Sequence, residues 1–114
     1  MAESAIGRIP VYRIAAPSGN AIADRMEREP RSLGLVRRRT RELPNLLPLP
    51  AGCPCCTGRV ALEIALARHV RERRPERIYI EVPDPAHAPQ LAAVIARGPL
   101  SRYLEDAGEE RLDA

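Results

Sequence analysis

The chain of 114 residues contains no lysine, no tryptophan and no phenylalanine, and it has only three tyrosines. The lack of lysine excludes every mechanism that needs a lysine side chain. Because 45% of the residues are hydrophobic while aromatic residues are scarce, the core has to be built from Leu, Ile, Val and Ala. The length fits a single small domain over residues 1–114.

Long apolar runs are also missing. No stretch approaches the roughly 20 residues that a membrane-spanning helix needs, and the N-terminus does not have the pattern of a signal peptide. We therefore expect a cytoplasmic protein with no membrane partner. Eighteen arginines stand against fifteen acidic residues, for a net charge of +3. This mixed charge is typical of a solvated surface and does not favour a nucleic-acid partner.

Strand-like and helix-like patterns alternate along the chain. The expected strands are 9–16, 33–37 and 77–82, and the expected helices are 20–29, 57–74 and 88–98. The proline-rich stretch 42–50 can form only an edge strand or an extended segment, because proline cannot donate to a strand ladder. The alternation predicts an α/β fold with a small, mainly parallel sheet and flanking helices. Residues 1–8 and 107–114 are expected to be flexible tails, and the chain is expected to fray after Leu104.

The longest expected helix, 57–74, carries apolar residues in two sets of positions. One set is Val60, Ile64 and Ala67, and the other is Leu62, Leu66 and Val70. An apolar stripe of this width predicts that the helix packs on a sheet, through Ile64, Leu66 and Val70.

All three cysteines lie in one short stretch, Gly-Cys-Pro-Cys-Cys, as Cys53, Cys55 and Cys56. Thiolates are preferred ligands of zinc and of similar metals. The stretch comes directly before the expected helix 57–74, and the positive end of a helix dipole lowers the pKa of a nearby thiol. An odd number of thiols leaves one unpaired in any disulfide arrangement. The cluster therefore indicates metal or redox chemistry rather than a structural disulfide.

Zinc usually takes about four protein ligands, so three thiols leave one position open. Glu81, at the end of the expected strand 77–82, and His87, in the turn that follows, are the main candidates. Asp84, Glu42, water and a second subunit are further candidates for this position. Glu81 could instead pair with one of the many arginines. We expect His69, late in the helix 57–74, to lie on the surface.

Two segments resemble the CobW-type P-loop GTPases, a family associated with cobalamin biosynthesis and with the trafficking of metals, chiefly zinc. The first segment is GCPCCTGRVALEIALARHV and the second is IYIEVPDPAHAPQLAAVI. The resemblance covers residues 43–95 well and residues 10–26 in outline. It implies a fold like part of a P-loop NTPase domain, with Cys53 and Cys55 as metal ligands and Cys56 as a third ligand or a buried neighbour. A metalloprotein client or a full-length CobW-type GTPase is the partner that it implies.

The chain also departs from the family pattern. Where family members have a Gly-x-x-x-x-Gly-Lys-Thr phosphate loop, this chain has APSGNAIADRM. A phosphate loop needs glycine amides and a lysine around the phosphates. The guanine-binding Asn-Lys-x-Asp motif is impossible without lysine, and residues 1–114 do not extend over the family's C-terminal domain. We therefore expect a degenerate member with no GTPase activity, no nucleotide site and no catalytic residue.

The leading hypothesis is thus a zinc-binding, CobW-like module that acts in metal trafficking or as an accessory to a metalloprotein. The main alternative is a protein-interaction module whose cysteines are vestigial or redox-active, for example through a disulfide between Cys53 and Cys56. A thiol oxidoreductase is the third reading, since residues 53–56 contain the Cys-x-x-Cys spacing. Short, proline-interrupted sheet edges and a small core also favour a homodimer.

Overall fold

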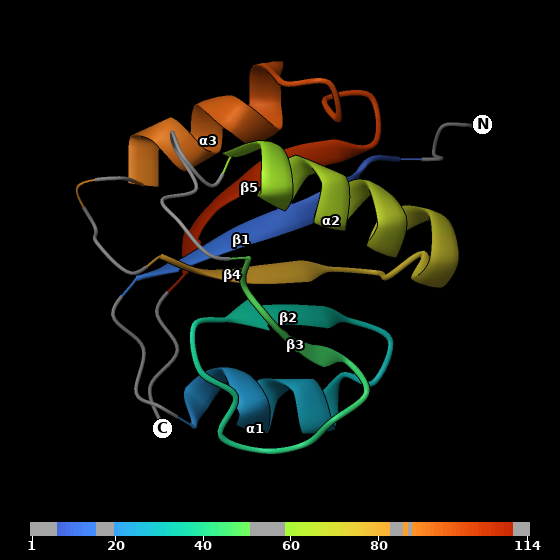
Figure 1. Ribbon diagram of the computed structural model, residues 1–114, viewed down its shortest axis with the longest axis vertical. Coiled ribbons are helices and arrows are strands. Elements are labelled where there is room, and N and C mark those ends of the chain that lie inside the picture. Colours follow the sequence, from blue (N-terminus) through green and yellow to red (C-terminus); the bar gives the residue numbers. More distant parts are fainter. Residues whose placement is uncertain (1–6, 16–19, 51–58, 83–85, 87, 111–114) are drawn as a thin grey trace.

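The computed structural model describes residues 7–15, 20–50, 59–82, 86 and 88–110 of the chain. Within these residues, five strands form one sheet, and a helix follows each of β1, β3 and β4 (Figure 1). None of the described helices is long and apolar enough to cross a membrane. The strands are β1 (Ile9–Ala15), β2 (Leu33–Val36), β3 (Leu46–Pro48), β4 (Ile78–Val82) and β5 (Leu104–Glu110), and the helices are α1 (Ala21–Arg28), α2 (Arg59–Arg73) and α3 (Ala88–Arg97).

The sheet has the strand order β3-β2-β4-β1-β5, and every neighbouring pair is parallel. The α/β fold with a small parallel sheet and flanking helices, predicted from the sequence, is therefore confirmed. The proline-rich stretch forms β3, a three-residue strand at one edge, as its prolines require. The connection from β1 through α1 leads to β2, on the β3 side of the sheet. The connection from β4 through α3 leads to β5, at the opposite edge.

Helices α2 and α3 cover one face of the sheet (Figure 1). Their buried side chains meet those of β1, β2, β4 and β5 in one aliphatic cluster. Leu62 and Leu66 are buried in it, and Val70 packs against it. The prediction that Ile64 packs on the sheet is wrong, because its side chain is 60% exposed. Two residues span about 200° on a helix, so Ile64 lies nearly opposite Leu62 and Leu66.

Helix α1 covers the opposite face (Figure 1). Its buried residues Ile22 and Met26 pack near Tyr79 of β4. Gly34 of β2 lies directly beneath the helix, and a Cβ atom at this position would come within 3.0 Å of the Ile22 and Met26 side chains. The glycine therefore allows α1 to approach the sheet closely. Alternation along β4 separates the two faces, since Tyr79 lies under α1 whereas Ile80 lies under α2 and α3.

The segment expected to fray after Leu104 instead forms β5, which pairs in parallel with β1. The expected flexible tail is therefore wrong for residues 107–110, and residues 111–114 lie outside the described residues. Three side-chain interactions account for the difference. The first is Leu104, whose side chain is buried in the aliphatic cluster. The second is a bidentate ion pair between Asp106 and Arg13 of β1, with Oδ1 2.9 Å from Nε and Oδ2 3.3 Å from Nη2. The third is the ion pair between Glu110 of β5 and Arg25 of α1 at 3.5 Å. This edge strand of acidic residues is thus held by one buried apolar side chain and two ion pairs.

Candidate functional site

The carboxyl edge of a parallel sheet is where α/β folds usually form ligand sites, at a point where the chain leaves neighbouring strands in opposite directions. In this sheet β1 and β4 are neighbours. The helix after β1 is α1, on one face, and the helix after β4 is α3, on the other face. The topology therefore makes the carboxyl ends of β1 and β4 the candidate functional site.

Glu81 is the predicted site residue that the structure describes at this edge. Its half-buried side chain is the last but one of β4, and its Oε1 accepts a hydrogen bond of 2.8 Å from the backbone amide of Arg37. The backbone pairing of β2 with β4 ends at Leu35 and Ile80, so this bond extends the contact between the two strands past the ladder. The Arg37 amide, and not a guanidinium, thus orients the carboxylate. A carboxylate with one amide donor retains acceptor sites for a cation.

The other predicted ligands, Cys53, Cys55, Cys56 and His87, lie outside the described residues. The described residues on either side show only where the chain enters and leaves these two segments. The cysteine segment follows β3 and precedes α2, while His87 follows β4 and precedes α3. The carboxyl ends of β3 and β4 lie on the same edge, with β2 between them. Two strand spacings are roughly 10 Å, so the two segments start from neighbouring points of that edge.

Within the described part of the chain, no group of three or more His, Cys, Asp or Glu side chains could hold a metal ion. His69 is not the surface residue that the sequence predicted. Its side chain is half-buried on α2, and its Nδ1 is buried without a hydrogen-bond partner. Burial and the nearby charges of Arg73 and Arg68 lower the pKa of this imidazole. His69 therefore belongs to no group of possible metal ligands among the described residues.

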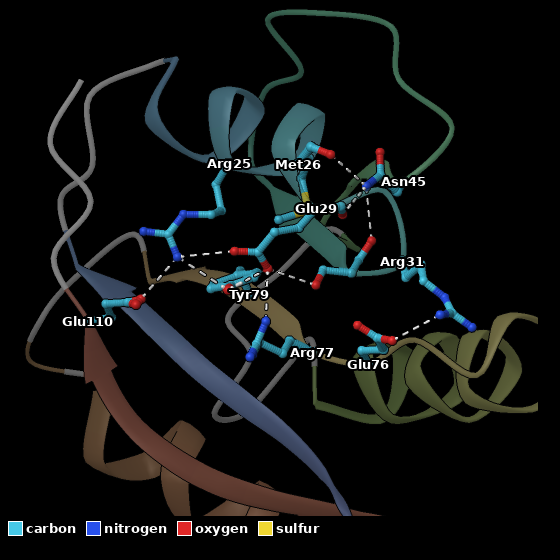
Figure 2. A network of polar contacts seen from close by, with 10 residues as sticks. Arg25, Met26, Glu29, Arg31, Asn45, Glu76, Arg77, Tyr79 and Glu110 are labelled. Atoms are coloured by element: carbon cyan, nitrogen blue, oxygen red, sulfur yellow. Dashed lines mark hydrogen bonds and ion pairs between the residues drawn. The ribbon is translucent and has the colours of Figure 1, made fainter.

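A polar network links the end of α1 to the sheet, as Figure 2 shows. At its centre, the Tyr79 hydroxyl donates a hydrogen bond of 2.9 Å to Oε1 of Glu29, and Ser32 donates one of the same length to the same oxygen. Arg25 donates to the Tyr79 hydroxyl at 3.3 Å and lies over the Tyr79 ring. Arg77 forms an ion pair with Glu29 at 3.5 Å. Nothing in the sequence pattern indicated this network, because its residues come from distant parts of the chain.

Burial and the neighbouring groups shift the pKa values of Glu29 and Tyr79 in this network. Burial disfavours the ionised form of Glu29, but the hydrogen bonds from Tyr79 and Ser32 and the charges of Arg25 and Arg77 outweigh it, so the pKa of Glu29 lies below its usual value. Burial raises the pKa of Tyr79, and its hydroxyl therefore stays protonated as a donor. No group in the network is placed as a nucleophile. The arrangement anchors the end of α1 to β4.

Asn45, just before β3, is a second polar residue with a structural role. Its buried Nδ2 lies within hydrogen-bond distance of three backbone carbonyls, those of Met26 at 3.1 Å, Glu29 at 3.1 Å and Ser32 at 3.0 Å, which share its two hydrogens (Figure 2). The last carbonyls of a helix have no partner within the helix and need an outside donor. Asn45 supplies this donor for the end of α1. An asparagine between a proline and a run of leucines was the only sequence signal for this role.

The search against protein-family models finds no match to this chain, and no curated protein and no solved structure matches it either. The resemblance to CobW-type proteins therefore depends on the residues of the two quoted segments alone.

Proposed function

We propose that this chain is a metal-binding module of the CobW type, with zinc as its first candidate ion and without GTPase activity. Cys53, Cys55 and Cys56 are the proposed thiolate ligands. The observation that carries this proposal is the presence of three thiols within four residues between β3 and α2. In the cytoplasm, where thiols stay reduced, such a cluster is suited to a metal ion and not to a stable disulfide.

The donor set fits a thiophilic divalent ion. Three thiolates and one carboxylate or imidazole make the four ligands that zinc takes in proteins. Glu81 supports this reading because its carboxylate is fixed at the carboxyl edge, where the chain enters both the cysteine segment and the segment with His87. Either Glu81 or His87 would be the fourth ligand in this proposal, unless water or a second chain completes the set.

Ligand exchange would be the mechanism of such a module. A set of three thiolates with one weaker ligand gives up its ion to a partner that offers more donors. The client would be a metalloprotein or a full-length CobW-type GTPase. Metal binding needs deprotonated thiols, so affinity would fall and protons would be taken up as the pH decreases. The chain lacks a lysine for a phosphate loop, so nucleotide hydrolysis has no part in this mechanism.

Metal analysis tests the proposal directly. The reduced protein, purified without chelator, is expected to bind about one zinc ion, with Zn–S distances near about 2.3 Å by X-ray absorption. Cys53→Ser and Cys55→Ser should each weaken zinc binding sharply, because serine is not readily ionised. Cys56→Ser should have a smaller effect if this residue is a buried neighbour. Wild-type protein with titratable thiols and no bound zinc would refute the proposal.

The fourth ligand needs a separate comparison. His87→Ala and Glu81→Gln are the informative pair, because each removes one candidate donor. The variant that loses as much zinc affinity as Cys53→Ser identifies the ligand. Glu76→Gln is the matched control, since this exposed carboxylate is paired with Arg31 at 3.4 Å before the start of β4 and should leave zinc binding unchanged.

A second candidate function is supported by the exposed face of α2. Val60 and Ile64 are 59% and 60% exposed, one turn apart on the helix that follows the cysteines. Exposed large apolar side chains of this kind occur at protein-interaction surfaces. In this reading the cysteines are vestigial or redox-active, and the module acts by binding a partner. Variants of Val60 and Ile64 that lose the partner while all three cysteine variants keep it would favour this function.

A further inference from the structure

A groove of about 650 Å³ lies at the amino edge of the sheet, at the opposite end of the strands from the edge where the chain leaves β3 and β4. Three parts of the chain form it: the residues at the start of β1, the second half of α2 and the loop between α3 and β5. These parts lie together in Figure 1. The lining residues are Gly7, Ile9, Ala67, Val70, Arg71, Arg74, Pro75, Leu100, Arg102 and Tyr103. The volume falls in the range of small-molecule sites.

Backbone hydrogen bonds hold the walls of this groove in place. The amide of Ile9 donates to the carbonyl of Tyr103 at 2.7 Å, which joins β1 to the loop before β5. Within the loop, the amide of Tyr103 donates to the carbonyl of Leu100 at 2.9 Å. On the other side, Arg74 has a φ of 45° at the end of α2 and donates to the carbonyl of Val70 at 3.1 Å, which ends the helix before Pro75. The groove is thus preformed.

The floor and the rim of the groove have different chemistry. Ile9, Val70 and Leu100 are half-buried and pack against the aliphatic cluster, so the floor is apolar. Tyr103 adds an aromatic side chain that is 51% exposed.

Among the described residues of the lining, the charged ones are three arginines, Arg71, Arg74 and Arg102, and none is a carboxylate. No hydrogen bond or ion pair to another described residue engages these guanidiniums. Elsewhere in the described chain the partly buried arginines Arg13, Arg25 and Arg41 all have carboxylate partners.

We infer that this groove binds a small amphipathic anion, a molecule with an apolar chain or ring and a carboxylate or phosphate head group. The apolar body would lie along Val70 and Leu100, and the head group would be bound at the rim by the guanidiniums, which match the geometry of both anions. The inference is independent of the proposed metal function, because the groove lies at the amino ends of the strands, whereas the chain enters the cysteine segment after the carboxyl end of β3.

Decanoate is a suitable probe because it has a ten-carbon chain and a carboxylate. A titration followed by amide NMR should give a dissociation constant of about 0.1 to 1 mM, which is the strength expected for a ligand of this size. The shifted amides should be those of Ala67, Leu100 and Tyr103. Butanoate, which keeps the head group but loses most of the chain, and decyltrimethylammonium, which keeps the chain but reverses the charge, should both bind at least about tenfold more weakly.

Two double variants separate a specific site from general charge attraction. R71Q/R102Q should weaken decanoate binding by about tenfold, at roughly threefold for each exposed guanidinium. R68Q/R97Q removes the same net charge from two exposed arginines that do not line the groove. This variant should bind decanoate with the same affinity as the wild type. All four positions are exposed, so both variants should fold.

Three results would overturn the inference. The first is equal binding of decanoate and decyltrimethylammonium, which would show apolar binding without charge selection. The second is an equal loss of affinity in both double variants, which would show unspecific attraction. The third is a set of shifted amides around Val60 and Ile64 in place of the groove. Bound zinc should not alter decanoate affinity, so failure of the metal proposal would leave this result unchanged.

Discussion

The face of the sheet under α2 and α3 buries aliphatic side chains, whereas the face under α1 combines apolar packing with a polar network. On the first face, Leu62 and Leu66 contact strand residues such as Ile78 and Ile80. On the second face, Ile22 and Met26 pack beside Tyr79, whose hydroxyl bonds to Glu29. The first face therefore depends on shape and apolar area, and the second depends in addition on hydrogen bonds between residues far apart in the chain.

This difference has an energetic consequence. Removal of a buried aliphatic side chain loses its transfer free energy and leaves a cavity. Removal of one partner of a buried hydrogen bond loses less apolar area but leaves a polar group without a partner. The face under α2 and α3 should therefore respond most strongly to truncation, and the face under α1 should respond to changes in charge and in pH.

Truncation of Leu66 is expected to have the largest effect. Leu66 is 1% exposed in the aliphatic cluster, so Leu66→Ala should lower the free energy of unfolding by about 2–5 kcal/mol. Urea unfolding followed by circular dichroism would measure the change. Leu66→Asp should be more damaging still, because it buries an unpaired charge.

Ile64→Ala is the matched control for Leu66→Ala. It lies two residues away on the same helix, but its side chain is 60% exposed. Its free energy of unfolding should stay within about 0.5 kcal/mol of the wild type. Equal effects of the two substitutions would mean that α2 is rotated on the sheet relative to the structure, with Ile64 facing the core as the sequence pattern first suggested.

The sequence predicted the elements that depend on local patterns. Residues 77–82 alternate β-branched and polar side chains and form β4, and the prolines around Leu46 confine β3 to the edge. The orientation of α2 was not predictable in this way, because apolar residues occur on nearly all sides of the helix and no rule of spacing decides which side meets the sheet. Only the arrangement of the strands decides this.

Elements that depend on distant partners were missed. The acidic stretch of β5 is held by an ion pair between Asp106 and Arg13, which are 93 residues apart. The bond between Tyr79 and Glu29 joins residues 50 positions apart. At the candidate site, the sequence predicted that Glu81 lies near the end of a strand, and the structure places it as the last residue but one of β4. It did not predict that the amide of Arg37 would orient this carboxylate, because neighbouring strands meet only after folding.

The polar anchor at Asn45 should show an intermediate effect. Asn45→Ala removes the donor to three carbonyls, including those of Met26 and Ser32, and should lower the free energy of unfolding by about 1–3 kcal/mol. Asn20→Ala is the control, since this exposed asparagine precedes α1 and makes no side-chain capping bond. Hydrogen exchange should report faster opening of α1 in the Asn45 variant alone. Equal protection of α1 in both variants would show that Asn45 does not anchor the helix.

The smallest effect is expected at Glu29, and it depends on pH. The pKa of Glu29 is lower in the folded protein than its usual value of 4.5, so ionised Glu29 stabilises the fold above that pH, and this contribution is lost as the pH falls below it. Glu29→Gln should therefore be less stable than the wild type by about 1 kcal/mol at pH 7, and the gap should narrow on acidification to pH 3. Glu42→Gln removes a carboxylate whose side chain is 92% exposed and should follow the wild type over the whole range. Thermal unfolding of the three proteins from pH 7 to pH 3 would test this prediction. If the stability difference between Glu29→Gln and the wild type stayed constant with pH, the network around Tyr79 would not depend on the charge of Glu29. In that case the two faces of the sheet would differ in the polarity of their residues but not in the way they respond to pH.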